Sequence, residues 1–567
     1  MAQMFWLLLT ALIPYKWQSV HIRGGGAITS IVVCPQDPRR VYALCDVGGV
    51  YRSDDYGGTW RIVNRGLWTD GESSAATLAI HPRNPNILYL GTGEAWGRPK
   101  GPYGGLLVSR DGGETWEVLS REVKFCGHGS YVQFGEVLQI APWDPRTLYA
   151  GTYVDGVMRS RDGGRTWERL GLEGLHISSL QIHPKRAGLI VVSTNEGVFI
   201  SRDDGRTWAH ALKGVHARDV ALDPEDPNTI YVVTLRRGVF KSADGGETWE
   251  AANTGLDKYL PHLRGQSIEA DPKRPGALYV CFHEVHYRYR HPNRFKTTDG
   301  GRTWKPIPRS IERNVHLHGW WKSKGWFCAH PHCIEVGPEG RVYIGDWYTV
   351  WRSDDGGENW HACNEGLETT CIMSLVAHPQ VEGVLYVGCA DVGFFRTTDG
   401  GKTFDVRCAV ASDVWQIVAV PKVPLSSPFY TAMTTLYVVA DGSVWKSRDG
   451  GEYWTNLSKK TDLPEGKATS VALRPGDYKR VYVWVAGVGL AVSEDEGLHW
   501  HVVAPEGLPS IKRGYHIVLD PEREEVLYLW NREDGIFKST DGGRTFKRIT
   551  KGIPYLHPPR FRLGDFV

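Results

Sequence analysis

The sequence has no excess charge of either sign, because 66 Lys and Arg residues are balanced by 64 Asp and Glu among 567 residues. This balance removes the electrostatic argument for a nucleic acid or an anionic membrane as partner. Long apolar runs are also missing. The stretch from Met4 to Pro14 is too short to span a bilayer, and no Lys or Arg precedes it, so it is a poor signal peptide. The ten cysteines include no Cys-x-x-Cys pair, which leaves disulfides and export open.

Glycine, proline and aromatic residues are plentiful: 66 Gly, 32 Pro and 11% Phe, Trp and Tyr. This composition favours an all-β fold rich in tight turns. One motif, Ser/Thr-x-Asp-x-Gly-x-Thr-Trp/Phe in its commonest form, recurs eleven times at intervals of 41 to 56 residues. Such a period is typical of propellers and solenoids. The copies begin at Ser53, Ser109, Ser160, Ser201, Ser242, Thr297, Ser353, Thr397, Ser447, Ser493 and Ser539.

Each copy of the motif belongs to a unit of four predicted strands. An apolar run ending in His-Pro or Asp-Pro is followed by a strand containing Leu-Tyr, a strand of the form Gly-Val-Phe, the motif, and a last short strand. Hairpins of this kind indicate propeller blades. The motif is an Asp-box, a turn between the third and fourth strands whose Asp accepts hydrogen bonds from turn amides. The Trp or Phe that follows is predicted to pack between neighbouring sheets. A structural role is favoured over catalysis or calcium binding.

The blade pattern also sorts the loops onto two faces. Turns between strands 1 and 2 and between strands 3 and 4 lie on one face, and the remaining connections lie on the other. Asp46 and Asp391, each followed by Val-Gly, fall between strands 2 and 3, opposite the Asp-boxes. The long insertions fall on this second face, which we predict to be the working face. They span residues 93–105, 121–136, 283–293 and 312–333.

Three stretches resemble the xyloglucanases of glycoside hydrolase family 74. They are "WQSVHIRGGGAITSIVVCPQDPRRVYALCDVGGVYRS" (17–53), "GWWKSKGWFCAHPHCIEVGP" (319–338) and "GLETTCIMSLVAHP" (366–379). The resemblance implies two β-propellers that face each other across a substrate cleft. Seven Asp-boxes precede Gly366 and four follow it. We therefore expect an N-terminal seven-bladed propeller over residues 1–365 and an abridged C-terminal propeller over residues 366–567. One large ring of ten to eleven blades is the alternative.

The same resemblance implies a glycosidase of the endo-β-1,4-glucanase or xyloglucanase type that acts with inversion in the cleft between the propellers. Asp46 and Asp391 match the two loops that carry the family's catalytic aspartates. Inversion needs one protonated carboxyl for the leaving oxygen and one carboxylate to activate water. Asp391 is assigned as general acid and Asp46 as general base, with the roles exchangeable. Turn capping is the alternative for both residues. Phe394 stands where the family usually has glycine.

Aromatic residues outside the Asp-boxes are candidates for sugar binding. Flat sugar faces stack on such rings, because apolar area leaves water and C–H groups meet the π face. A place in the core between blades is the alternative for each of them. The candidates are Trp96, Tyr103, Trp320, Trp321, Trp326 and Trp347.

Histidine and cysteine gather between residues 283 and 333, which raises the question of a metal. His-x-His on an extended strand places both imidazoles on one side, as a transition metal requires. A Cys328–Cys333 disulfide, or hydrogen bonds from histidine to sugar or backbone, are the alternatives, and no known zinc spacing is matched. No cofactor is assigned, and a metal here would be structural. Its candidate ligands are His316, His318, Cys328, His330, His332 and Cys333.

Two classes of function follow from these patterns. The first is a glycoside hydrolase with a polysaccharide substrate, expected outside the cell or at its surface. The second is a non-catalytic Asp-box propeller that binds a glycan or a protein, as sortilin-type and photosystem-assembly propellers do. Neither class needs a nucleic acid or a membrane span.

Overall fold

The computed structural model describes residues 26–46, 48–67, 74–94, 104–126, 136–284, 291–307, 330–390, 392–406, 413–420 and 434–550. These residues form eleven sheets, each built on four antiparallel strands that are consecutive in the chain, and one sheet carries a fifth strand. The sheets are numbered here as blades 1 to 11 in chain order. The prediction of an all-β chain of four-stranded propeller blades is therefore confirmed.

The first seven blades share one architecture, with a short fourth strand after the Asp-box in most of them. In blade 2 an additional strand, β9, pairs in parallel with β6. Blade by blade, the strands are β1 (Ile28–Val33), β2 (Val41–Cys45), β3 (Gly49–Ser53), β4 (Arg61–Ile62); β5 (Ser74–Ile80), β6 (Leu88–Glu94), β7 (Gly105–Ser109), β8 (Glu117–Ser120), with β9 (Phe125–Cys126); β10 (Leu138–Ile140), β11 (Leu148–Gly151), β12 (Val157–Ser160), β13 (Glu168–Arg169); β14 (Ile177–Ile182), β15 (Ile190–Thr194), β16 (Gly197–Ser201), β17 (Ala209–Lys213); β18 (Ala217–Leu222), β19 (Ile230–Thr234), β20 (Gly238–Ser242), β21 (Glu250–Ala251); β22 (Leu263–Ala270), β23 (Leu278–Glu284), β24 (Arg294–Thr297), β25 (Lys305–Pro306); β26 (Pro331–Val336), β27 (Val342–Asp346), β28 (Val350–Ser353) and β29 (His361–Cys363).

The last four blades repeat this pattern. Two short helices interrupt the strands of the described chain: the 3-10 helix η1 (Leu260–His262) before β22, and α3 (Leu457–Lys460) after β37. The strands of blades 8 to 11 are β30 (Ile372–Ala377), β31 (Leu385–Cys389), β32 (Gly393–Thr397), β33 (Asp405–Val406); β34 (Val414–Val420), β35 (Thr435–Ala440), β36 (Ser443–Ser447), β37 (Thr455–Asn456); β38 (Lys467–Arg474), β39 (Asp477–Ala486), β40 (Gly489–Ser493), β41 (His501–Val503); β42 (His516–Leu519), β43 (Leu527–Asn531), β44 (Gly535–Ser539) and β45 (Lys547–Arg548).

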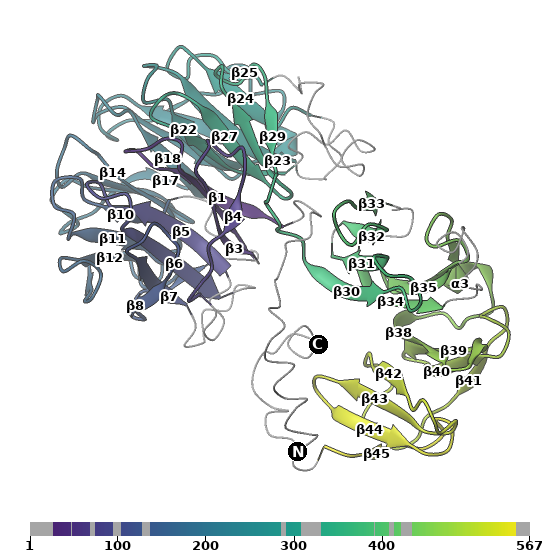
Figure 1. Ribbon diagram of the computed structural model, residues 1–567. Coiled ribbons are helices and arrows are strands. Elements are labelled where there is room, and N and C mark those ends of the chain that lie inside the picture. Colours follow the sequence, from purple (N-terminus) through teal and green to yellow (C-terminus); the bar gives the residue numbers. More distant parts are fainter. Residues whose placement is uncertain are drawn as a thin grey trace, which may run out of the picture. The chain divides into compact units, whose positions relative to one another are not determined.

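The described residues fall into two compact units, with the limit between Thr369 and Thr370. In the N-terminal unit the first strand of each blade packs against the first strand of the next, and β26 of blade 7 packs against β1 of blade 1 (Figure 1). This unit is a closed ring of seven blades, as predicted for the first seven Asp-boxes. The closed ring rules out the alternative of one large ring. The predicted domain boundary between residues 365 and 366, as a limit between parts that fold independently, stays a prediction.

The C-terminal unit is an arc of four blades. Packing runs from β30 to β34, from β34 to β38 and from β38 to β42. Within the described residues no comparable packing joins β42 back to β30, and Figure 1 shows the two end blades apart.

A blade that lies between two neighbours is covered on both faces. For this reason β2 of blade 1 (Val41–Cys45) is buried along its whole length and does not alternate between apolar and polar residues.

A Gly–Trp contact joins neighbouring blades. Between blades 1 and 2, the Trp116 amide donates to Arg65 O at 2.8 Å and its ring Nε1 donates to Val63 O at 2.8 Å. Gly66 has φ +96°, and a Cβ there would lie 2.1 Å from Trp116 O. Only glycine fits this position.

The same contact closes the N-terminal ring. The Trp60 amide donates to Glu365 O at 2.8 Å, and Trp60 Nε1 donates to Cys363 O at 3.0 Å. A Cβ at Gly366 would lie 2.0 Å from Trp60 O. Blades 7 and 1 are thus joined by the same contact as blades 1 and 2, and among the described residues no strand pairs across the seam between them.

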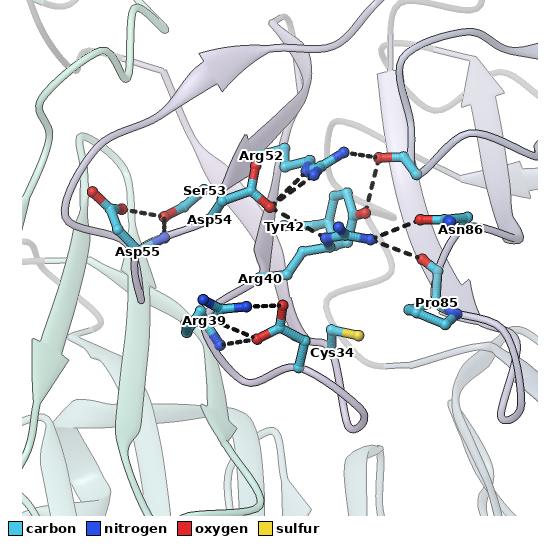
Figure 2. Close-up of polar contacts among 12 residues, drawn as sticks. Cys34, Arg39, Arg40, Tyr42, Arg52, Ser53, Asp54, Asp55, Pro85 and Asn86 are labelled. Carbon is cyan, nitrogen blue, oxygen red and sulfur yellow. Dashed lines mark hydrogen bonds and ion pairs between the residues drawn. The ribbon is translucent and has the colours of Figure 1, made fainter.

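Further polar contacts link blades 1 and 2 on the Asp-box face (Figure 2). Arg52 pairs with Asp54 at 2.8 Å and donates to Gly112 O at 2.9 Å, an oxygen that also accepts from the Tyr42 hydroxyl at 2.9 Å. Arg40 pairs with the same Asp54 at 3.2 Å. Because Asp54 is half-exposed, these ion pairs orient the turns more than they stabilise the fold.

Asp219 of blade 5 links its blade to blade 6 from a buried position. Its carboxylate accepts from Ile268 N of the next blade at 3.1 Å and from Val220 N at 2.9 Å. Burial raises the pKa of Asp219 to about 6, although these hydrogen bonds oppose the rise.

We expect the stability of the wild-type protein relative to an Asp219→Asn variant to fall as the pH rises from 4 to 7. The pKa of Asp219 is higher in the folded state than in the unfolded state. The protonated carboxyl therefore makes its full contribution to stability below pH 3.8, and this contribution is lost as the pH rises through about 6. The change corresponds to roughly 3 kcal/mol. Thermal unfolding of both proteins across this pH range measures it, and a difference that does not vary with pH would contradict the expectation.

Candidate functional site

The turn that carries Asp46 joins β2 to β3. Because Cys45 pairs with Gly49, only three residues form this turn, and Asp46 is the first of them. Asp46 N donates to Ala27 O at 3.1 Å, and the Cys45 thiol donates to Asp46 Oδ1 at 3.7 Å. The residue is 4% exposed, so its side chain lies in a confined position.

The Asn64 side chain forms two hydrogen bonds at the end of this turn. Its Nδ2 donates to Gly48 O at 2.7 Å, and its Oδ1 accepts from Val50 N at 2.8 Å. Gly49 has φ +78°, and a Cβ there would meet the Asn64 side chain at 2.5 Å. Sequence reasoning did not single out Asn64, although Asn-x-Gly-Leu recurs at Asn253 and Asn364 and was the available signal.

A segment that follows blade 7 forms hydrogen bonds with residues beside this turn. Gly26 N donates to Thr369 Oγ1 at 3.0 Å, and the Tyr51 hydroxyl donates to Glu368 O. Residues 366–369 lie in the first compact unit, where Glu368 and Thr369 accept these two hydrogen bonds near Asp46.

Asp391 itself lies outside the described residues, but its turn joins β31 to β32. Cys389 pairs with Gly393 as Cys45 pairs with Gly49. Ala390 N donates to Cys371 O at 3.0 Å, which is the counterpart of the bond from Asp46 N. Asp391 is therefore the second residue of its three-residue turn, whereas Asp46 is the first.

Other acidic residues in turns between strands 2 and 3 have structural roles. Asp346 accepts from Tyr348 N and Thr349 N at 2.8 Å and from Trp351 Nε1 at 2.9 Å. Burial raises its pKa to about 6. Asp534 likewise accepts from the Tyr515 hydroxyl at 2.7 Å. Turn capping therefore accounts for Asp346, whereas the Asp534 carboxylate binds neighbouring side chains.

Two of the predicted metal ligands, His330 and His332, lie close to one predicted sugar-binding residue, Trp347. The rings of His330 and His332 are 5.7 and 5.6 Å from the half-buried ring of Trp347. His283 lies 5.0 Å from His332. Burial lowers the pKa of His330 to about 4 and that of His283 well below its usual value. These imidazoles are therefore neutral near pH 7 and offer hydrogen bonds, not charge.

The described residues of this cluster do not form a metal site. Cys333 packs into the core between blades 7 and 1 and its thiol donates to Ile28 O at 3.9 Å, while His332 Nδ1 bonds to the same carbonyl at 3.3 Å. Across the described part of the chain no group of three His, Cys, Asp or Glu side chains could hold a metal. The predicted ligands His316, His318 and Cys328, and with Cys328 the disulfide alternative, lie outside the described residues.

A carboxylate–histidine pair stands in the turn between strands 2 and 3 of blade 6. Glu284, 5% exposed, lies 2.8 Å from His291 Nδ1, and the His291 ring stacks on His262 at 4.3 Å. The sequence reasoning noted the histidines of this loop but not Glu284. The remaining predicted sugar-binding residues lie outside the described residues: Trp96, Tyr103, Trp320, Trp321 and Trp326.

None of the helices in the described part of the chain has the length and hydrophobicity needed to cross a bilayer. The model of the sortilin family (Sortilin, neurotensin receptor 3) matches residues 15–139 and 196–331. Among curated proteins, a xyloglucanase of Acetivibrio thermocellus is 36% identical over 162 residues, which is 28% of this chain and 19% of that protein. A probable oligoxyloglucan-reducing end-specific xyloglucanase of Neosartorya fischeri is 30% identical over 191 residues, 32% of this chain and 23% of that one. The matched regions span about a fifth of the length of these curated relatives.

Solved structures extend the likeness to the whole chain. The GH74 xyloglucanase of Xanthomonas campestris superposes with a TM-score of 0.65 at 18% identity, over 94% of this chain and 95% of that one. An ancestral GH74 enzyme gives a TM-score of 0.70 at 18% identity, over 94% and 78% of the two chains. At this identity the comparison concerns the fold, which is the β-propeller fold of GH74 enzymes.

Proposed function

We propose that this protein is a glycoside hydrolase that cleaves β-1,4-glucan backbones such as xyloglucan. The observation that carries the proposal is the sequence similarity to xyloglucanases from several organisms, on a chain with the propeller fold of GH74 enzymes. The confined position of Asp46, in a turn held by hydrogen bonds, supports it. The substrate would be a polysaccharide met outside the cell or at its surface.

The proposed chemistry is inversion by two carboxyl groups, with Asp391 as general acid and Asp46 as general base. Asp46 is proposed for the role in which a fixed carboxylate orients and deprotonates a water molecule, because its turn is held in place by hydrogen bonds. The hydrogen bonds that Asn64 forms with Gly48 O and Val50 N at the end of the turn, and the bond from Gly26 N to Thr369, limit movement of the backbone around it. A carboxylate held this way does not need to reorganise during the reaction.

Trp347 is the described residue proposed to contact sugar. Its ring is half-buried and its described neighbours include His330, whose pKa burial lowers to about 4, and His332, so stacking and hydrogen bonds would both be available to an uncharged glycan. The undescribed aromatic residues Trp96, Tyr103, Trp320, Trp321 and Trp326 are proposed for the same role.

Release of reducing ends tests the proposal. Purified protein is incubated with tamarind-type xyloglucan, with a mixed-linkage β-glucan and with a soluble cellulose derivative, and reducing sugar is measured over time. We expect the fastest release from xyloglucan, with a fall in viscosity if attack is internal. No release from any of the three polysaccharides would contradict the hydrolase.

The second candidate is a non-catalytic propeller that binds a glycan or a protein, and the match of the sortilin family model favours it. The two candidates differ in one measurement. A binding protein would retain xyloglucan or a partner in an affinity experiment without shortening the polysaccharide, whereas the hydrolase releases products that chromatography resolves.

A further inference from the structure

Among the described residues, the first and the last blade of the C-terminal arc, blades 8 and 11, each expose a side that a neighbouring blade covers elsewhere in the protein. The leading face of a blade is defined here as the side toward the preceding blade, and the trailing face as the side toward the next. On the leading face of blade 8, Ile372 is 46% and Leu375 61% exposed. Their counterparts by strand pairing in blade 1 are Ile28 and Ile31, which are 0% and 2% exposed because blade 7 covers them.

The trailing face of blade 11 is open in the same way. Val518 is 51% and Ile549 42% exposed, and Tyr528, Trp530 and Ile536 between them are only partly buried. The corresponding face of blade 1 packs against blade 2 and is buried throughout. Its residues are Val32, Tyr42, Leu44, Val50 and Val63.

These two open faces are the two halves of one blade-to-blade contact. The contact between blades 7 and 1 contains the counterparts of both faces. Glu335 of blade 7 occupies the position of Val518, and Ile31 of blade 1 occupies the position of Leu375. The Glu335 side chain accepts a hydrogen bond at 3.0 Å from Val33 N, two residues after Ile31. The contact between blades 7 and 1 shows what such halves do when they meet: they bury a continuous apolar core. Exposed apolar area of this kind favours association.

We propose that the chain forms a two-fold dimer through its C-terminal units. The leading face of blade 8 of each copy packs on the trailing face of blade 11 of the other, and the eight blades close a ring. A second copy is the occupant because it carries both complementary faces at once, and a two-fold axis satisfies both contacts. Eight blades lie within the range that propellers adopt. The proposal is independent of the glycosidase activity.

Light scattering after size exclusion tests the dimer on the full chain. At roughly 50 μM the wild type is expected to have twice the monomer mass. Leu375→Glu places a charge in the apolar contact and is expected to raise the dimer dissociation constant at least ~100-fold. The control is Leu498→Glu, a 53% exposed leucine in the Asp-box turn of blade 10, which should remain dimeric. A monomeric wild type, or a Leu375→Glu protein that stays dimeric, overturns the proposal.

Mixing two variants tests the reciprocal pairing and guards against misfolding. Leu375→Glu and Val518→Lys should each be monomeric alone, because each spoils both contacts of its own dimer. Mixed together they should form a heterodimer with one wild-type contact and one Glu–Lys contact. Recovery of the dimer mass shows that both variants are folded and that blade 8 meets blade 11. A mixture that stays monomeric overturns the proposal, as would pairing of identical faces.

Discussion

Asp46→Asn is expected to lower the turnover of xyloglucan by at least ~100-fold, and Asp391→Asn by a similar factor. The amide has the size of the carboxylate and keeps an oxygen that accepts from the Cys45 thiol, but it can neither activate water nor donate a catalytic proton. The melting temperature should therefore change little. Initial rates of reducing-sugar release, measured with thermal unfolding of the same samples, give both values.

Asp441→Asn is the matched control for these variants. Asp441 follows β35 in the turn to β36, and its Oδ1 accepts from Asp413 N at 3.1 Å, a bond that asparagine retains. We expect near wild-type activity from it. If Asp46→Asn or Asp391→Asn also keeps near-full activity while folded, the assignment of the two catalytic carboxyls is wrong. Loss of activity in all three variants would point to damage of the fold and not to chemistry.

Gly366→Ala is expected to destabilise the N-terminal ring by about 2–5 kcal/mol, the sum of a left-handed backbone and an overpacked contact. Gly366 has φ +77°, and the new Cβ would lie 2.0 Å from Trp60 O, a backbone atom that moves only if the seam between blades 7 and 1 opens. Thermal unfolding and limited proteolysis of the full chain report the loss, and cleavage should appear near residues 363–369.

Gly214→Ala separates the two contributions. Gly214 belongs to the same ring and has φ +71°, yet a Cβ there would meet nothing within 4 Å. It should therefore cost only about 1–2 kcal/mol, the strain of the backbone alone. Equal losses from the two substitutions would show that the contact with Trp60 does not hold the ring closed.

The local pattern of the chain was sufficient to predict the blades. Strand pairing within a blade links residues close in sequence, and the turns depend on glycine at positions such as Gly49, where the backbone has φ +78°. The Asp-box period and the order of four strands could therefore be read directly, as could the place of Asp46 between β2 and β3. The positions of the candidate carboxyls needed the family resemblance as well, because acidic residues in these turns are common and two of them, Asp346 and Asp534, have structural roles.

Closure of the ring and the surroundings of the site were decided only by the tertiary structure. Trp60 meets Cys363, and Gly26 meets Thr369, across more than 300 residues, and no local pattern specifies which distant blade will supply those partners. For the same reason residues 366–369 belong to the first unit. Strand pairing also places Cys333 in the core, although its spacing in the sequence suggested a ligand. Sequence determines which blades form, because their contacts are local, whereas packing between blades determines where the ring closes and which side chains meet there.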